Sequence, residues 1–258
     1  MIGRLHGAII AAGRGERLRG AVDGLPKPLV ELGGETMLVR QARLLRQAGA
    51  ETVVALVNSE TAGLIAARAV RIPPWMDLQV RDTPSSMESL FTLGEHLHGA
   101  RHFLLATVDA VIDAAELRRF VARAENAIDS DAIELTGGPT VRFDGALAVV
   151  RWRGDKRPLF VEAASDGVIV ALGERESATV TAGFYYLPAA IFDFAPRARA
   201  ERLDAMRRLL AMAVASGMRL AAIELATTID VDESADLAAA RAMVAGAAIR
   251  GEFEGSGD

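Results

Sequence analysis

Short apolar runs alternate with stretches of helical periodicity through the first half of the chain. Three runs have the length and composition of buried strands, namely 8–11, 52–57 and 102–107. Between the first two, Met37–Gln47 carries apolar residues at helical spacing and is followed by Gly49, a common helix end. A strand, a helix and a second strand in this order form a parallel crossover unit. The alternation therefore predicts an α/β fold with a mostly parallel central sheet.

The predicted secondary structure changes from mixed helices and strands to short strands after residue 130. The part before it also has helical patterns at 61–70, 85–98 and 114–124 and a short strand at 78–80. The part after it has short β-like runs punctuated by glycine, at 132–135, 147–152, 159–163, 168–172 and 179–187. A helix over 201–216, a strand over 219–225 and a helix over 233–244 follow. We expect one domain over 1–246, with halves at 1–130 and 131–246, and a flexible tail over 247–258.

Length, composition and charge exclude several classes of protein. The 258 residues, of which 51% are hydrophobic and 24% charged, can bury a sizeable core. The chain has no cysteine, which excludes disulfides, thiolate nucleophiles and zinc–cysteine sites and favours a cytoplasmic location. We expect no secretory signal and no membrane span, because the apolar runs are too short. The formal charge of -5 argues against nucleic acid as a partner.

The first predicted strand leads directly into a loop rich in glycine and arginine. Gly13 and Gly15 alternate there with Arg14 and Arg17. Glycines let backbone N–H groups approach phosphate oxygens closely, and guanidinium groups neutralise and chelate them. Lys27 follows between two prolines, so its backbone has little freedom. This pattern indicates a site for a small phosphorylated ligand, and the simpler alternative is a turn with solvated arginines.

Two better-known glycine loops fit less well. A Walker loop needs Gly-Lys-Ser or Gly-Lys-Thr, and neither occurs in the chain. The dinucleotide fingerprint needs a third glycine where Leu18 stands, so a Rossmann dinucleotide site fits poorly.

Asp109 has the strongest position for a metal-binding carboxylate. It comes directly after the strand over 102–107, and in open α/β sheets ligands bind outside the carboxyl ends of strands. Asp113 has a structural explanation, because with Glu116 it forms a capping box for the next helix. Ser85 and Glu88 fit a capping box in the same way.

Two motifs together carry a family resemblance. The run A-A-G-x-G-x-R-L at 11–18, followed by P-K-P-L at 26–29, resembles the signature of sugar-phosphate and MobA-like nucleotidyltransferases. The resemblance implies a three-layer Rossmann-like (GT-A-like) nucleotidyltransferase fold with a mostly parallel mixed sheet and a small antiparallel acceptor-side part. The half over 1–130 would then bind the nucleotide, and the half over 131–246 the acceptor.

The resemblance also implies roles for individual residues. Arg17 and Lys27 match the catalytic cations. The nucleotide-binding positions match Ala11, Ala12, Gly13, Arg14, Gly15, Ser85 and Ser86. The Mg²⁺ ligands match Asp109 and the late acidic motif that holds Asp230 and Asp232. The motif departs from the family at Glu233 and Ser234, where threonine and proline are common, and Asp232 has the alternative role of capping the last helix.

The acceptor pocket is harder to assign. Glu162, Thr181 and Tyr185 are candidates for binding the acceptor. Strand alternation alone would also place such residues on a sheet face, and that explanation stays open.

The implied reaction is Mg²⁺-dependent transfer of a nucleoside monophosphate from an NTP to a phosphorylated sugar, polyol or small alcohol, with release of pyrophosphate. The compact size and the D-x-D-x-x-x-D-L ending at 230–237 resemble cytidylyltransferases that act on inositol phosphate or phosphocholine, which favours CTP. Guanylyl transfer to molybdopterin, and uridylyl or thymidylyl transfer to a hexose 1-phosphate, are the enzyme alternatives. A catalytically silent nucleotide-binding regulatory module is the non-enzyme alternative, and a metal-dependent glycosyltransferase is disfavoured by the PKPL run. The oligomeric state stays open.

Overall fold

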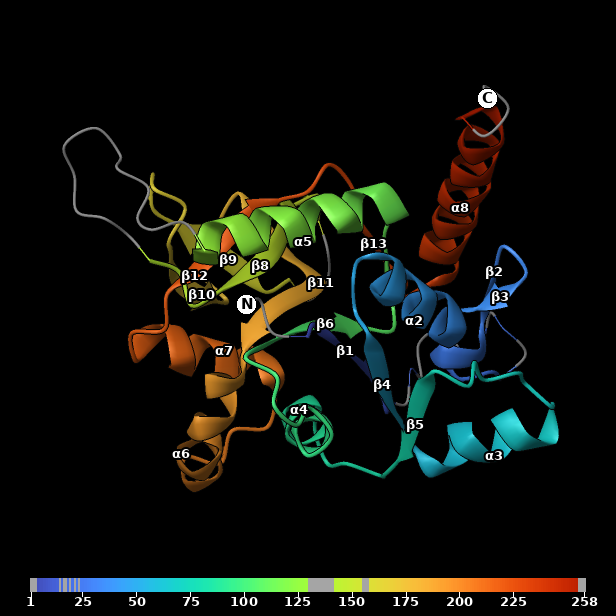
Figure 1. Cartoon of the computed structure of the whole chain (residues 1–258), viewed down its shortest axis with the longest axis horizontal. Helices are drawn as coiled ribbons and strands as arrows, with labels where there is room; N and C mark the ends of the chain where they lie inside the picture. The colour runs from blue at the N-terminus through green and yellow to red at the C-terminus, as the bar shows by residue number, and fades with distance from the viewer. Residues whose placement is uncertain are drawn as a thin grey trace.

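A nine-stranded mixed sheet forms the centre of the computed structural model, which describes residues 4–13, 15, 18, 20, 22, 24–129, 142–154 and 158–254 (Figure 1). Its parallel part contains β1 (His6–Ala11), β4 (Thr52–Val57), β5 (Met76–Val80) and β6 (His102–Thr107). β1 lies between β4 and β6, and β5 lies outside β4. In chain order, β4 and β5 are therefore added on one side of β1, and β6 is added on its other side. The crevice at the carboxyl ends of β1 and β6 is the place where such a sheet binds ligands.

The second half of the chain adds the antiparallel part. Its strands are β8 (Gly145–Arg151), β9 (Phe160–Ala163), β10 (Ile169–Gly173), β11 (Thr179–Pro188) and β12 (Leu220–Glu224). β11 runs antiparallel to β6 and connects the two parts, and it also pairs with β8 and β9. β12 is parallel to β8. The predicted α/β class, with a mostly parallel centre and a small antiparallel part, is confirmed.

Helices cover both faces of the sheet and give three layers (Figure 1). The helices α2 (Met37–Gln47) and α5 (Ala114–Asp129) pack on one face, and α4 (Ser86–Gly94) and α7 (Met206–Ala215) on the other. The alternation of β1 divides its side chains between these layers, because Ile9 joins the core under α2 whereas Ile10 joins the core under α4. The helices α3 (Ser59–Ala67), α6 (Ala195–Ala200) and α8 (Ser234–Glu254) complete the set.

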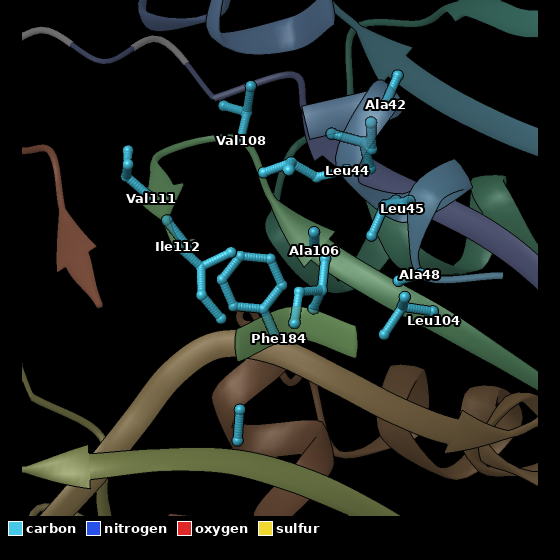
Figure 2. Close-up of a cluster of buried hydrophobic side chains, with 14 of the residues drawn as sticks. Ala42, Leu44, Leu45, Ala48, Leu104, Ala106, Val108, Val111, Ile112 and Phe184 are labelled. Carbon is cyan, nitrogen blue, oxygen red and sulfur yellow. The ribbon is translucent and has the colours of Figure 1, made fainter. Parts of the chain in front are cut away.

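The core under α2 continues beyond the end of β6. Figure 2 shows Val108, Val111 and Ile112 gathered with Ala106 and Phe184, and each of these side chains is buried. The chain segment that follows β6 is therefore anchored by its own apolar side chains.

The described residues also form short elements outside the main sheet. The 3-10 helices are η1 (Lys27–Leu29) and η2 (Ala189–Phe194). Two small antiparallel ribbons pair β2 (Glu31–Leu32) with β3 (Glu35–Thr36), and β7 (Ala110–Val111) with β13 (Ile229–Asp230).

Several predicted boundaries differ from the structure. The helix predicted over 201–216 begins only at Met206, where the backbone N–H donates to the Ser86 hydroxyl from another helix at 3.0 Å. The short helix α6 was not predicted, because it is proline-containing and carries no apolar periodicity. α8 continues to Glu254, so the first part of the expected flexible tail is helical; the alanines there favour a helix. The strand predicted over 132–135 lies outside the described residues. Among the helices that the structure describes, none has both the length and the apolar character to span a bilayer.

Candidate active site

The ribbon of β7 and β13 brings together carboxylates that are far apart in the sequence. Asp230 pairs with Ala110, and the N–H of Val231 donates to the carbonyl of Asp109 at 3.0 Å. As a result, Asp109, Asp230 and Asp232 each place a carboxylate oxygen within 4.8 Å of the others. The late acidic motif therefore meets the end of β6 through backbone pairing.

Lys27 lies against this carboxylate cluster. Its Nζ atom is 2.9 Å from Oδ2 of Asp109 and 2.5 Å from Oδ1 of Asp232. The residue is buried, and each aspartate side chain is 26% exposed. Burial alone lowers the pKa of Lys27, but the charges and hydrogen bonds of Asp109 and Asp232 outweigh it and raise the pKa above its ordinary value. Lys27 is therefore a fixed positive charge at the carboxyl edge of the sheet.

Gly15 makes room for this lysine. Its φ is +57°, and a Cβ atom there would lie 2.8 Å from Cγ of Lys27. A side chain at this position would press on the lysine stem and strain the backbone. The second glycine of the loop thus has a steric role toward Lys27 in addition to any role toward phosphate.

The end of β1 supplies the remaining described residues of the glycine loop. Ala11 is buried at the end of the strand, and the carbonyl of Ala12 accepts a hydrogen bond from Nδ2 of Asn58 at 3.1 Å. Gly13 is exposed, with open space where its side chain would be. Arg14 and Arg17 lie outside the described residues.

A cavity of about 530 Å³ opens beside the carboxylate cluster. Its lining comes from both halves of the chain and includes Ser86, Thr107, Asp109, Arg153, Thr181, Gly183, Tyr185, Arg207, Thr228, Asp230, Asp232, Glu233 and Asp236. Thr181 and Tyr185, two of the candidates for binding the acceptor, thus line this cavity. Burial raises the pKa of Tyr185 to about 12, so its phenol stays protonated at neutral pH.

A bulge in β11 shapes the floor of this cavity. The pairing of β11 with β8 is interrupted between Thr181 and Tyr185. Gly183 within the bulge has a φ of +77°, and a Cβ atom there would lie 2.4 Å from Cβ of Ala110. The glycine therefore allows β11 to approach the segment that carries Asp109.

The sequence of residues 7–179 matches the family described as the MobA-like NTP transferase domain. This chain belongs to the MobA-like NTP transferase family. Membership confirms the resemblance found in the glycine loop and the PKPL run, and it makes the chain a nucleotidyltransferase.

Curated relatives match the chain over part of its length. The bifunctional IPC transferase and DIPP synthase of Rubrobacter xylanophilus is 32% identical over 154 residues, which are 55% of this chain and 33% of that protein. The mannose-1-phosphate guanyltransferase of Yarrowia lipolytica is 43% identical over 54 residues, which are 21% of this chain and 15% of that protein. The chain thus spans a third or less of the length of these relatives.

Solved structures match almost the whole chain at low identity. The inositol-1-phosphate CTP transferase of T. maritima has a TM-score of 0.70 at 17% identity and covers 95% of this chain and 98% of its own. A putative glucose-1-phosphate thymidylyltransferase of Bacillus anthracis has a TM-score of 0.73 at 16% identity, over 93% of this chain and 95% of its own. The CTP:phosphocholine cytidylyltransferase of Streptococcus pneumoniae has a TM-score of 0.65 at 15% identity, over 93% of this chain and 99% of its own. These matches confirm the fold of the NTP transferase.

The two serines of this NTP transferase have different contacts. Ser85 is the N-cap of α4 and accepts a hydrogen bond from the N–H of Glu88 at 3.2 Å, as predicted. The carboxylate of Glu88, the other half of the predicted capping box, accepts hydrogen bonds from Arg199. Ser86 lines the cavity, and its hydroxyl accepts the N–H of Met206.

The acidic side chains at the starts of α5 and α8 follow the predicted capping patterns only in part. Asp113 accepts a hydrogen bond from the N–H of Ala115, but Glu116 reaches the N–H of Ala226 instead of the helix start. Asp236 accepts hydrogen bonds from the N–H groups of Asp232 and Glu233. The carboxylate of Asp232 contacts Lys27.

One acceptor candidate and several lining residues differ from the prediction. Glu162 is not among the residues that line the cavity, and its carboxylate lies 3.7 Å from Arg175 on the exposed side of β9. Arg153 and Arg207 were missed, because exposed arginines on a strand end and a helix start have no distinctive sequence pattern. Gly183 had a usable signal, since a glycine inside a strand pattern often marks a bulge.

Proposed function

We propose that this NTP transferase transfers CMP from CTP to a small phosphorylated alcohol or polyol and releases pyrophosphate. The observation that carries the proposal is the contact of Lys27 with two carboxylates of a three-aspartate cluster, beside a cavity that both halves line. The choice of CTP and of a phosphorylated alcohol is supported by two of the structural neighbours, named as an inositol-1-phosphate CTP transferase and a CTP:phosphocholine cytidylyltransferase.

The carboxylate cluster fits a hard divalent cation. Asp109, Asp230 and Asp232 offer three carboxylates within 4.8 Å of one another, and oxygen is the ligand that Mg²⁺ prefers. We propose that these residues would hold Mg²⁺, which would supply positive charge to neutralise the triphosphate.

The reaction requires little proton transfer by side chains of the protein. An oxygen of the acceptor phosphomonoester forms a bond to the α-phosphorus of CTP, and the bond from that phosphorus to the β-bridging oxygen breaks. The electron pair leaves with pyrophosphate. A phosphomonoester has a second pKa of about 6, so the nucleophile is already ionised near neutrality. What the chain supplies is alignment and charge neutralisation, and Lys27 together with Arg17 are the cations proposed for the triphosphate.

The acceptor phosphate needs a second set of cations. Arg153 and Arg207 both line the cavity, and Arg207 lies in the first turn of α7. Guanidinium groups bind phosphate bidentately, and a helix N-terminus also favours an anion. We propose that these two arginines hold the acceptor phosphate, with Thr181 and Tyr185 as neighbouring polar contacts.

A hexose 1-phosphate acceptor is the second candidate. Its support is the similarity to a putative glucose-1-phosphate thymidylyltransferase and to a mannose-1-phosphate guanyltransferase. Guanylyl transfer to molybdopterin has the family description alone in its favour. The retained Lys27, Asp109 and Asp232 disfavour a catalytically silent module.

The test is a matrix of nucleotides and acceptors. The protein is incubated with Mg²⁺ and each of CTP, UTP, dTTP and GTP, together with inositol 1-phosphate, phosphocholine, glucose 1-phosphate or mannose 1-phosphate, and pyrophosphate is measured. We expect the highest rate with CTP and a phosphorylated alcohol, and a rate at background without an acceptor. A maximum with a hexose 1-phosphate would favour the second candidate. Absence of pyrophosphate from every pair would contradict transfer to these acceptors.

A further inference from the structure

Two consecutive polar side chains of α2 are buried beneath the segment that carries Asp109. Gln41 is 1% exposed and Arg40 is 6% exposed. Burying an arginine is costly unless its charge and its donors find partners. The cost is visible in its titration, because burial and the charge of Arg43 lower the pKa of Arg40 to about 10.

Both side chains donate to backbone carbonyls on either side of Asp109. Nε2 of Gln41 donates to the carbonyl of Thr107 at 3.3 Å, and Nη2 of Arg40 donates to the carbonyl of Ile112 at 2.8 Å. Thr107 is the last residue of β6, and Ile112 directly follows β7. The two bonds therefore hold the ends of the segment whose middle presents Asp109 to the cavity.

The rest of this segment has its own anchors. The N–H of Val108 donates to the carbonyl of Ile10, and the carbonyl of Asp109 accepts the N–H of Val231. The side chains of Val108 and Ile112 are buried in the same core, where Ile112 lies beside Phe184 (Figure 2). With these contacts, the bonds from α2 satisfy a part-buried carbonyl at Thr107 and a buried one at Ile112, the two points where the chain leaves regular pairing.

We infer that Arg40 and Gln41 are positioning residues that set the place of the Asp109 carboxylate relative to Asp230 and Asp232. The inference rests on the proposed metal-dependent transfer. Residues that orient metal ligands from behind affect metal affinity without touching the metal. Neither side chain is among those that line the cavity, so neither contacts substrate there.

The experiment compares matched pairs on one helix. Arg40→Met and Gln41→Met remove the two donors and keep approximate side-chain volume. Arg46→Met and Gln47→Met are the controls, because both side chains are exposed on the same helix. Arg46 donates to the carbonyl of Glu51, and Gln47 accepts a hydrogen bond from Arg43. Binding of Mn²⁺ to the nucleotide-free protein is followed by electron paramagnetic resonance, and folding is checked by circular dichroism.

We expect Arg40→Met and Gln41→Met to weaken Mn²⁺ binding by about tenfold or more, the range typical of residues behind metal ligands. The control variants should stay within about twofold of wild type. Arg40→Lys, which keeps a donor, should recover part of the affinity, and saturating Mg²⁺ should recover turnover in Gln41→Met. Folded Arg40→Met and Gln41→Met proteins that bind Mn²⁺ like wild type would overturn the inference. If Arg40→Met does not fold, Gln41→Met decides, because it removes a neutral donor. Wild-type protein that binds Mn²⁺ but releases no pyrophosphate would count against the proposed transfer alone.

Discussion

The groups at the carboxylate cluster and the arginines at the cavity wall present their charges in opposite ways. In the first half, Lys27 is buried and ion-paired, and Asp109 lies on a segment held at both ends by α2. In the second half, Arg153 and Arg207 are exposed at the cavity wall. In the proposed function, the fixed groups serve a reaction step that needs preorganised charge. The exposed groups are proposed to recognise the acceptor, and such a role can vary on an unchanged scaffold.

The largest effect is expected on the buried side of this contrast. Replacing Lys27 by Met should lower kcat by about 100-fold or more, because a preorganised positive charge is lost at the reacting phosphates. Asp109→Asn should act similarly through the proposed metal. Steady-state pyrophosphate release measures both, with the exposed Arg46→Met as the control. Activity retained in both variants would contradict the assignment of this cluster to catalysis.

The contact between the halves can be broken at Gly183. The Gly183→Ala side chain would meet Ala110 at 2.4 Å, in a backbone conformation that side chains rarely adopt. We expect a loss of about 2 kcal/mol in the free energy of unfolding, measured by urea denaturation. Gly173→Ala is the control, since its Cβ atom would meet nothing within 4 Å and its φ is not positive. Equal stability of the two variants would contradict this expectation and show that β11 can move away from Ala110 at little cost.

Replacing the exposed arginines of the cavity wall should change the KM for the acceptor rather than kcat. Arg207→Met and Arg153→Met should each raise the KM for the acceptor by about tenfold, the value of a lost charged hydrogen bond, and leave the KM for CTP unchanged. Arg208→Met is the matched control, because Arg208 lies next to Arg207, pairs with Asp204 at 3.4 Å and is not among the cavity-lining residues. A rise confined to the KM for CTP would reverse the proposed division between the halves.

The smallest effect concerns an ion pair that links α4 of the first half to α6 of the second. The hydrogen bonds from Arg199 lower the pKa of Glu88 below its ordinary value. A lowered carboxyl pKa gives stability that is present above about pH 4.5 and is lost as the pH falls through the folded-state pKa. Because the arginine is more than half exposed, Glu88→Gln should cost less than about 1 kcal/mol at pH 7. Thermal melts should show this difference at pH 7 and lose it near pH 3. A stability difference between wild type and Glu88→Gln that persists at pH 3 would show that packing, and not the charge of Glu88, causes it.

The sequence was most informative where structure follows from local patterns. The bounds of β4, β6 and α2, and the cap at Ser85, agree with the prediction because each depends on a run or spacing within one element. The meeting of Lys27, Asp109 and Asp232 came from the family resemblance and agrees in position, although the chemical roles stay predictions.

The sequence was least informative where contacts depend on register between distant segments. The start of α7 depends on Ser86, and the position of Asp232 depends on the pairing of β13 with β7. Arg153 and Arg207 reach the cavity only through the packing of β8 and α7 against the rest of the fold. Arg40 and Gln41 lie in an ordinary amphipathic helix pattern, and nothing in that pattern predicts their hydrogen bonds to Ile112 and Thr107.

The most direct test of the central claim is the location of a metal ion with nucleotide bound. Crystals of the protein with Mn²⁺ and a non-hydrolysable CTP analogue would give an anomalous difference map. We expect a peak at bonding distance from the carboxylates of Asp109 and Asp232, with the triphosphate within reach of Lys27. A peak elsewhere, or a triphosphate bound away from Lys27, would contradict it.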